Sequence, residues 1–333
     1  MPCDRAEKRA LIFAVALVAV AFVVSCCVGK YPLSVPEIFT IISGGQISDI
    51  KRNVFLTLRF PRTVMAMLAG IGLGMTGSVY QTIFKNPLAS PDIIGVANGA
   101  NLGAAVAIVL FGYNTLLTAS LSFLSGLLVM LLVVSLVRKT NQANTTTYIL
   151  AGIILKAVSE ACIMILKFFA DPEKELAAIE FWSMGSFGNI TASKLTAILP
   201  FFLAGLAGIV LMRRHIALLG LEDDESRTLG VRLKLIRSLV LSFSTLMVTS
   251  VICLSGLVNF VGLIAPHIAR LLLKRVSFAS SVFASLAGAF ILLVSDGFAR
   301  SVYSAEIPVS ILTTFIGVPF LIYFMRRGRA RRA

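Results

Sequence analysis

Charged residues and histidines are scarce in this sequence of 333 residues. Only 14% of the residues are Asp, Glu, Lys or Arg and two are histidine, whereas soluble domains carry about 25% charged residues. Hydrophobic residues make up 57% of the chain, and the mean hydropathy is +0.92. This composition excludes a water-soluble enzyme. It also excludes an intrinsically disordered chain, because disordered chains are poor in apolar residues.

Cysteine, metal-ligand and nucleotide-binding patterns are also missing. The five cysteines are odd in number, and four of them lie inside apolar runs, which does not suit a disulfide framework. His215 and His267 are far apart, and no His/Cys cluster has the spacing of metal ligands. The pattern G-x-x-x-x-G-K-[ST] is absent. We therefore expect no metal site, no cofactor bound by this chain and no ATP hydrolysis of its own.

Long apolar runs dominate what is present. Nine of ten runs approach the roughly 20 residues that cross a bilayer, and the run over 260–273 is short and contains Pro266, as discontinuous helices do. The first run resembles a signal peptide, but an uncleaved first span explains it in a polytopic chain. We predict an all-α membrane protein with one transmembrane domain over 1–333 and about ten spans, at 10–28, 63–84, 93–111, 116–137, 148–169, 195–212, 238–258, 260–273, 282–299 and 309–325.

The net charge of +14 supports this topology. With the N-terminus in the cytoplasm, alternating spans place 20 of the 30 Lys and Arg residues inside, nine outside and Lys156 within a span, as the positive-inside rule requires. Both termini are then cytoplasmic, 30–62 forms an external segment with a short surface helix, and 213–237 is the longest cytoplasmic connection. The positive charge is spread over many loops, so we expect no nucleic-acid partner.

Two arginines stand at the outer mouth of a span, where positive charge is unexpected. Arg59 and Arg62 flank Phe-Pro in the sequence Arg-Phe-Pro-Arg, and Arg300 lies near the outer end of the ninth span. They could dock acidic side chains of an external partner. Alternatively, Arg59 and Arg62 snorkel to lipid headgroups, and Arg300 forms an i,i+4 ion pair with Asp296.

One charged pair falls within the fifth span. Lys156 and Glu160 are four residues apart, so they share a helix face and can neutralise each other. Intramembrane charges usually face a pathway or the interior of a bundle. We interpret them as a structural or cavity-lining pair, with proton or ion coupling in a secondary transporter as the alternative.

Two cytoplasmic segments have an interpretable pattern. The segment from Glu222 to Gly230 is acidic at Asp223 and Asp224, basic at Arg227, and ends in glycine, which predicts a short amphipathic helix and a contact for a cytoplasmic partner. A solvated loop is the alternative. The segment 85–92 contains two prolines and predicts a rigid turn between spans.

Glycines recur at helical spacing within the spans. The stretch 72–77 fits G-x-G-x-x-G, but it lies in an apolar run with no βαβ context, so we reject dinucleotide binding. Small residues four apart let helices approach closely in lipid. We therefore expect close helix contacts at two groups of glycines, Gly70 with Gly74, and Gly95 with Gly99 and Gly103.

Seven short motifs occur in a fixed order along nearly the whole chain. They are Arg59-Phe-Pro-Arg62, Asn86-Pro-Leu-Ala89, Gly95-Val-Ala-Asn98-Gly99, Trp182-Ser-Met-Gly185, Ser226-Arg-Thr-Leu-Gly230, Gly262-Leu-Ile-Ala-Pro-His267 and Glu306-Ile-Pro308. Taken together and in this order, they resemble the FecCD-type permeases, the membrane subunits of type II ABC importers for iron-siderophores, haem and cobalamin.

The resemblance implies a transport subunit in a bacterial or archaeal cytoplasmic membrane. It implies a homodimer, or a pair with a paralogous permease, together with two cytoplasmic ATPase subunits that use ATP and Mg. An extracytoplasmic binding protein would dock at Arg59, Arg62 and Arg300, and the ATPase would contact the segment from Glu222 to Gly230. The expected cargo is an iron complex, with a siderophore complex first and haem or cobalamin as alternatives.

The resemblance also implies an inner gate, at the Asn86–Leu88 turn and at Thr145 and Thr146, with the pathway between the two subunits. The chain departs from the family pattern at Asn259, at Lys156 and Glu160, and in the density of its acidic cytoplasmic run. These departures leave the family unaffected but prevent any transfer of the substrate's identity.

Overall fold

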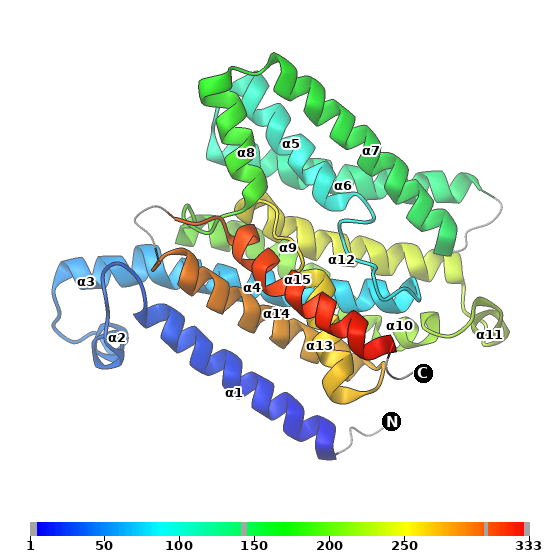
Figure 1. Cartoon of the computed structure of the whole chain (residues 1–333), viewed down its shortest axis with the longest axis horizontal. Helices are drawn as coiled ribbons and strands as arrows, with labels where there is room; N and C mark the ends of the chain where they lie inside the picture. Colours follow the sequence, from blue (N-terminus) through cyan, green and yellow to red (C-terminus); the bar gives the residue numbers. More distant parts are fainter. Residues whose placement is uncertain (1–4, 141–144, 303–305, 330–333) are drawn as a thin grey trace.

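The computed structural model describes residues 5–140, 145–302 and 306–329, and all described elements are helices (Figure 1). Ten of these helices follow the ten predicted apolar runs, so the predicted spans are confirmed as helices. They are α1 (Arg5–Cys27), α4 (Phe60–Ile83), α5 (Val96–Phe111), α6 (Thr115–Lys139), α7 (Thr145–Phe169), α9 (Ala192–Leu211), α12 (Leu233–Ser255), α13 (Val261–Leu273), α14 (Phe278–Ala299) and α15 (Val309–Arg329).

Seven of these helices are long and apolar enough to cross a membrane, and α5, α13 and the apolar part of α15 are shorter. The short α13 was expected. The short α5 corrects the predicted span 93–111, because the turn after α4 continues to Gly95 and the helix begins only at Val96. At 1.5 Å per residue its 16 residues extend about 24 Å, less than the roughly 30 Å hydrocarbon core.

The connections contain the remaining described helices. The external segment forms α2 (Val35–Ile42), which begins with a Ser34–Glu37 capping box, α3 (Asp49–Asn53) and the π-helical η1 (Val54–Arg59) that continues into α4. This confirms a surface helix in that segment. A second external connection holds η2 (Pro172–Leu176) and α8 (Ala177–Met184), and the cytoplasmic connection holds α10 (Arg213–Leu219) and α11 (Asp223–Thr228).

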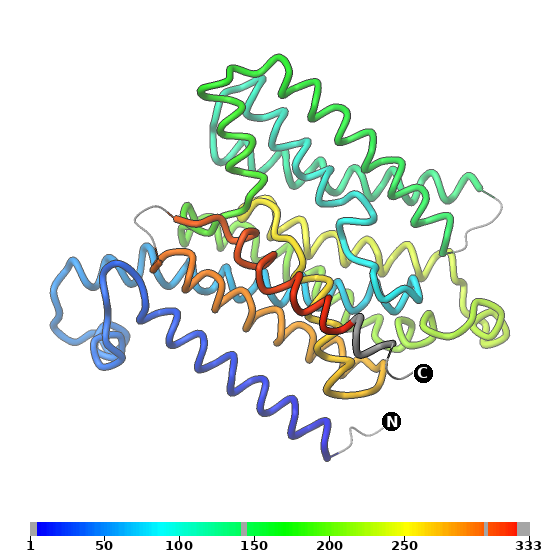
Figure 2. The backbone as a smooth tube through the Cα atoms, in the orientation of Figure 1, coloured from blue at the N-terminus to red at the C-terminus, as the bar shows by residue number. Residues whose placement is uncertain are grey.

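The helices form two groups joined by α12. Figures 1 and 2 show α5, α6, α7 and α8 on one side of α12, and α1, α4, α13 and α14 on the other. Helix α12 contacts α4, α5, α6 and α9. Most of its side chains are therefore buried, including polar ones in the middle of the span such as Thr245 and Ser250.

Close contacts at small residues join helices α4 and α14 within the group that contains α1, α4, α13 and α14. A Cβ atom added at Gly70 would lie 2.3 Å from the carbonyl oxygen of Gly288, and one at Gly74 would lie 2.2 Å from that of Ala284. Only glycine, whose side chain is a single hydrogen atom, permits α4 and α14 to approach this closely. The predicted role of Gly70 and Gly74 in helix contacts is thus confirmed.

Candidate functional site

Arg62 connects three elements at the outer end of the molecule. It lies in the first turn of α4, and its Nε donates to Asp296 Oδ1 of α14 at 2.8 Å. Its Nη1 donates to Glu306 Oε1, just before α15, at 2.5 Å. The Asp296 side chain has no exposed surface and that of Arg62 is 9% exposed. This ion-pair network therefore sits inside the protein, where an unpaired charge is costly.

Arg59 and Arg300 bind the C-terminal end of α1. Arg59 donates to the carbonyl oxygens of Cys26 at 3.0 Å and Cys27 at 2.6 Å. Arg300 donates to the carbonyl oxygen of Ser25 at 2.5 Å. Helix C-termini expose carbonyl groups that have no partner within the helix and carry partial negative charge. The two guanidinium groups therefore cap the C-terminus of α1 by donating hydrogen bonds to its free carbonyl groups.

The three arginines predicted to dock a binding protein are thus nearly buried, with 6–7% of each residue exposed. Arg300 also lies 3.5 Å from Asp296 Oδ2, so the i,i+4 ion pair considered from the sequence is present. Their contacts give all three a structural role within this chain. The docking role stays a prediction.

The cytoplasmic segment from Glu222 to Gly230 is helical, as predicted. Helix α11 begins at Asp223, directly after the N-cap Glu222, and the chain beyond it turns at Gly230 with φ +78°. Ser226 is buried, and its hydroxyl donates to the carbonyl oxygen of Leu218 at 2.8 Å, which holds α11 against α10. The Asp224 and Arg227 side chains are 95% and 67% exposed. One face of α11 is therefore exposed to solvent.

Asp223 faces inward and connects α11 to two other elements. Its Oδ1 accepts from Lys85 Nζ at 2.9 Å and from Arg237 Nη2 at 3.1 Å. Partial burial acts to raise the pKa of Asp223, but the bonds from Lys85 and Arg237 outweigh it and hold the pKa below its usual value. The cytoplasmic helix is thus tied both to the turn after α4 and to α12.

The residues predicted at the inner gate lie in two places. Asn86 Oδ1 accepts from the backbone N–H of Leu88 at 2.9 Å, which stiffens the turn, and the Leu88 side chain is exposed. Thr145 and Thr146 begin α7. The start of α7 is held by Tyr148, whose hydroxyl lies 2.8 Å from that of Ser238 in α12. The gate role of these residues remains a prediction.

Lys156 and Glu160 form the predicted pair on α7. Lys156 Nζ lies 3.8 Å from Glu160 Oε1, and Asn98 of α5 donates to the same oxygen at 2.9 Å. The Lys156 and Glu160 side chains are 39% and 49% exposed within this chain. Large apolar side chains on the same helix, such as Ile154 and Val158, are also half exposed.

Sequence reasoning missed the partners that place these residues. Glu306 was singled out only as part of a family motif, and the available signal was an acidic residue just before an apolar run, which favours an ion pair. Lys85 and Arg237 were counted only as cytoplasmic charge. Arg237 lies 14 residues after Asp223, across the non-helical stretch between α11 and α12. No spacing rule for helices connects two such positions.

Comparison with known proteins gives the family. Residues 17–327 match the FecCD transport family. The chain belongs to the FecCD transport family. It is 36% identical over 321 residues to the molybdate import system permease protein MolB of Haemophilus influenzae, with 94% of each chain covered. It is 31% identical to the ferric enterobactin transport system permease protein FepG of Escherichia coli, with 93% and 96% covered.

A solved structure shows the same fold. The inward-facing structure of a metal-chelate type ABC transporter superimposes with a TM-score of 0.87 and 33% identity, covering 96% of this chain and 99% of that one. This FecCD chain therefore has the type II ABC importer permease fold and is a multi-pass protein of the cytoplasmic membrane. It is a transport component and not an enzyme, and ATP hydrolysis belongs to a separate subunit.

Proposed function

We propose that this chain forms the translocation pathway of an ATP-driven importer as a homodimer, with two cytoplasmic ATPase subunits and an extracytoplasmic binding protein. The family implies partners of these kinds. The observation that carries the homodimer is the half-exposed Lys156–Glu160 pair on α7, in the middle of a membrane span. Charges at this depth face a pathway or a bundle interior, so α7 faces a second copy across a water-filled route.

The cargo we propose is an iron complex, with a ferric siderophore first. FecCD relatives such as FepG carry names of that class. Molybdate is the second candidate, because the identity to MolB is 36% and extends over 94% of both chains. Molybdate and the ferric complexes of catecholate siderophores carry negative charge, and Lys156 is a positive group on the exposed face of α7 that would attract such cargoes.

The test is uptake by a deletion strain and by proteoliposomes that contain the complete transporter. We expect uptake of one member of a panel of ferric siderophore, haem, cobalamin and molybdate. The uptake should require ATP inside and persist when an uncoupler removes the proton gradient. Uptake that the uncoupler abolishes at constant ATP would instead favour the ion-coupled transporter with Lys156 and Glu160 as its coupling site.

A second measurement tests the route between two copies. A cysteine at Ile154 on the exposed face of α7 should crosslink to its counterpart in the partner copy or react with a water-soluble thiol reagent in the inward-facing state. A cysteine at Leu203, near the middle of α9 and 49% exposed against 50% for Ile154, serves as the control and should not react. Reaction at neither helix would contradict a pathway along α7.

A further inference from the structure

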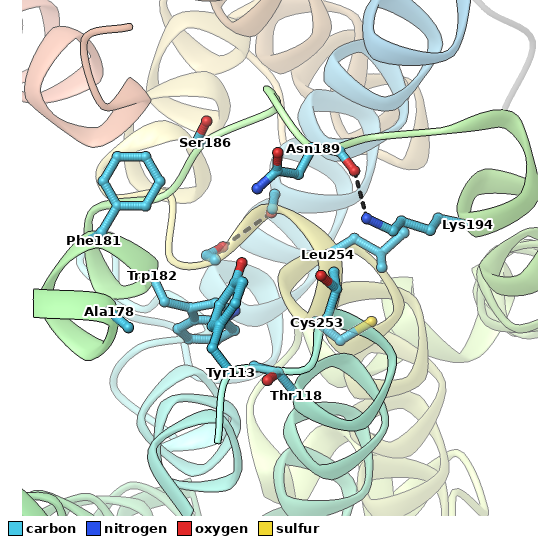
Figure 3. A pocket seen from close by; sticks show the side chains of 13 residues that line it. Tyr113, Thr118, Ala178, Phe181, Trp182, Ser186, Asn189, Lys194, Cys253 and Leu254 are labelled. Carbon is cyan, nitrogen blue, oxygen red and sulfur yellow. Dashed lines mark hydrogen bonds between the residues drawn. The ribbon is translucent and has the colours of Figure 1, made fainter. Parts of the chain in front are cut away.

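A cavity of about 340 Å³ lies at the outer ends of α6, α9 and α12, with α8 at its side (Figure 3). The aromatic side chains of Tyr113 and Trp182 line the cavity on one side of Leu254, and Lys194 lies on the other side of it (Figure 3). Lys194 Nζ donates to the carbonyl oxygen of Asn189 at 2.7 Å, as the dashed line in Figure 3 marks. The cavity thus has an aromatic wall and a cationic wall.

A second, apolar cavity of about 180 Å³ continues from the first. It occupies the groove between α6 and α9, and its lining includes Ala119, Ala197 and Ile198. Both cavities share Lys194 and the floor formed by Cys253 and Leu254 of α12. The two cavities are therefore one site, with a polar mouth and an apolar groove.

The groove has a definite depth. Phe123 of α6 and Phe201 of α9 meet across it, with ring centroids 5.0 Å apart, and close it on the cytoplasmic side. Phe201 lies seven positions after Lys194 along α9, which is about 10 Å at the rise of an α-helix. This length accommodates the upper part of an acyl chain.

The site lies at the outer leaflet of the membrane. Helices α6 and α9 both begin at the outer face, so the mouth is at headgroup level and the groove runs into hydrocarbon. Tyr and Trp side chains are typical of this depth. The groove is open to the side, because Leu116 near its mouth is 75% exposed and Phe201 at its lower end is 46% exposed.

The charge of Lys194 indicates which kind of molecule the two cavities can bind. Lys194 is the only charged side chain among the described residues that line the two cavities. An ammonium group has three donors, and the bond to Asn189 uses one of them. A molecule that fits must have an anionic head beside Lys194 and an apolar tail in the groove.

We propose that this is a binding site for an anionic phospholipid of the outer leaflet. Its phosphate binds the Lys194 ammonium, its headgroup lies against Tyr113 and Trp182, and one acyl chain fills the groove between α6 and α9. The bound lipid fills the space between α8 and α12 and so supports the outer end of the bundle. This site is separate from the charged pair on α7.

The chain contains a built-in reporter, because Trp182 is its only tryptophan. The purified protein is reconstituted in phosphatidylcholine vesicles with a low fraction of lipid whose acyl chains are brominated, since bromine quenches nearby tryptophan emission. Brominated phosphatidylglycerol should quench Trp182 more than brominated phosphatidylcholine at the same fraction. We expect a selectivity of about fivefold, which is what one lysine near an anionic surface provides.

Variants separate the head and tail parts of the site. Lys194→Gln should reduce the selectivity to near one, and Lys194→Arg should retain it. Lys174→Gln changes another external lysine, one that lines neither cavity, and should leave the selectivity unchanged. Ala197→Phe fills the groove and should reduce quenching by both brominated lipids. Trp182→Phe should remove the signal.

Several outcomes would overturn the proposal. Equal quenching by the two lipids in the unmodified protein would contradict an anion-selective site. Unchanged selectivity in a folded Lys194→Gln variant would move the selectivity elsewhere. Relief of quenching by a ferric siderophore or by molybdate would show that the cavity holds cargo instead. Absence of quenching would show that another protein surface covers the groove.

Discussion

Asp223 of α11 accepts hydrogen bonds at 3.1 and 3.4 Å from Arg237 of α12, a side chain with no exposed surface. Lys85, in the turn after α4, donates to the same carboxylate at 2.9 Å. A displacement of α11 would therefore act on both the base of α12 and the inner turn. This relationship provides a physical route by which an ATPase that contacts the exposed face of α11 moves the spans.

Asp223 and Asp224 should behave differently, although they are neighbours in the sequence. Asp223→Asn weakens two charge-assisted bonds and should lower the free energy of unfolding by about 1–3 kcal/mol. Asp224→Asn changes a side chain that is 95% exposed and should leave stability unchanged. Thermal unfolding in detergent measures this difference.

Binding of the ATPase should depend on the exposed Asp224, which contributes little to stability. We expect Asp224→Lys to reduce co-purification with a tagged ATPase at an unchanged melting temperature. Full complex formation and full ligand-stimulated hydrolysis in that variant would place the coupling contact elsewhere, with the turn from Asn86 to Asp92 as the next candidate.

The stabilising effect of Asp223 should depend on pH. Its pKa in the folded protein lies below the usual value, so its contribution is fully present above the unfolded-state pKa of about 3.9. The contribution is lost as pH falls through the lower folded-state pKa. The difference in melting temperature between the unmodified protein and Asp223→Asn should be constant from pH 7 to about pH 5 and shrink below pH 4. A difference that grows at acid pH would contradict the assignment.

Gly230 should resist substitution for a conformational reason. Its φ of +78° is unfavourable for residues with a Cβ atom, although the space around it is open. Gly230→Ala should cost about 1 kcal/mol and weaken coupling to the ATPase. Gly297→Ala is the matched control, because Gly297 is helical and also has open space around it. Equal effects of the two changes on melting temperature would show that the turn does not need glycine.

Arg62 should matter for folding in the absence of any partner. Arg62→Gln removes one cation from Asp296 and leaves it only Arg300, so the free energy of unfolding should fall by about 3 kcal/mol. The measurement is thermal unfolding of the purified permease without binding protein. An unchanged melting temperature combined with slower, salt-dependent association with the binding protein would instead support docking at Arg62.

The Lys156–Glu160 pair is suited to a double-mutant cycle. Each single change to Ala leaves one charge without its partner on the face of α7 that lines the proposed pathway, so either should reduce uptake more than the double change does. Asn98→Ala is a third variant, which should affect the protein only while Glu160 is present. Additive effects of Lys156→Ala and Glu160→Ala would show that the two side chains do not interact.

Much of the fold could be predicted because apolar runs and glycine spacing are local signals. Gly70 and Gly74 indicated a close helix contact without naming the partner, and the positive φ at Gly230 could be expected from its place after a short polar helix. The first residue of α5 could not be predicted from the sequence, because Ile93 and Ile94 are as apolar as the helix that follows them. Turn geometry and the contact of Gly95 with α7 decide that boundary.

The sequence alone determined that this chain crosses a membrane about ten times, which side its loops occupy, and to which family it is similar. The lengths of the apolar runs and the distribution of Lys and Arg over the loops are properties of the sequence, so no tertiary information is needed. Tertiary structure decided which charges pair. Arg62 and Glu306 are 244 residues apart, and only the convergence of α4, α14 and the start of α15 brings them to 2.5 Å. The tertiary structure also decided that Arg59, Arg62 and Arg300 are buried and not external. Each of these side chains donates hydrogen bonds to acceptors near the ends of neighbouring helices.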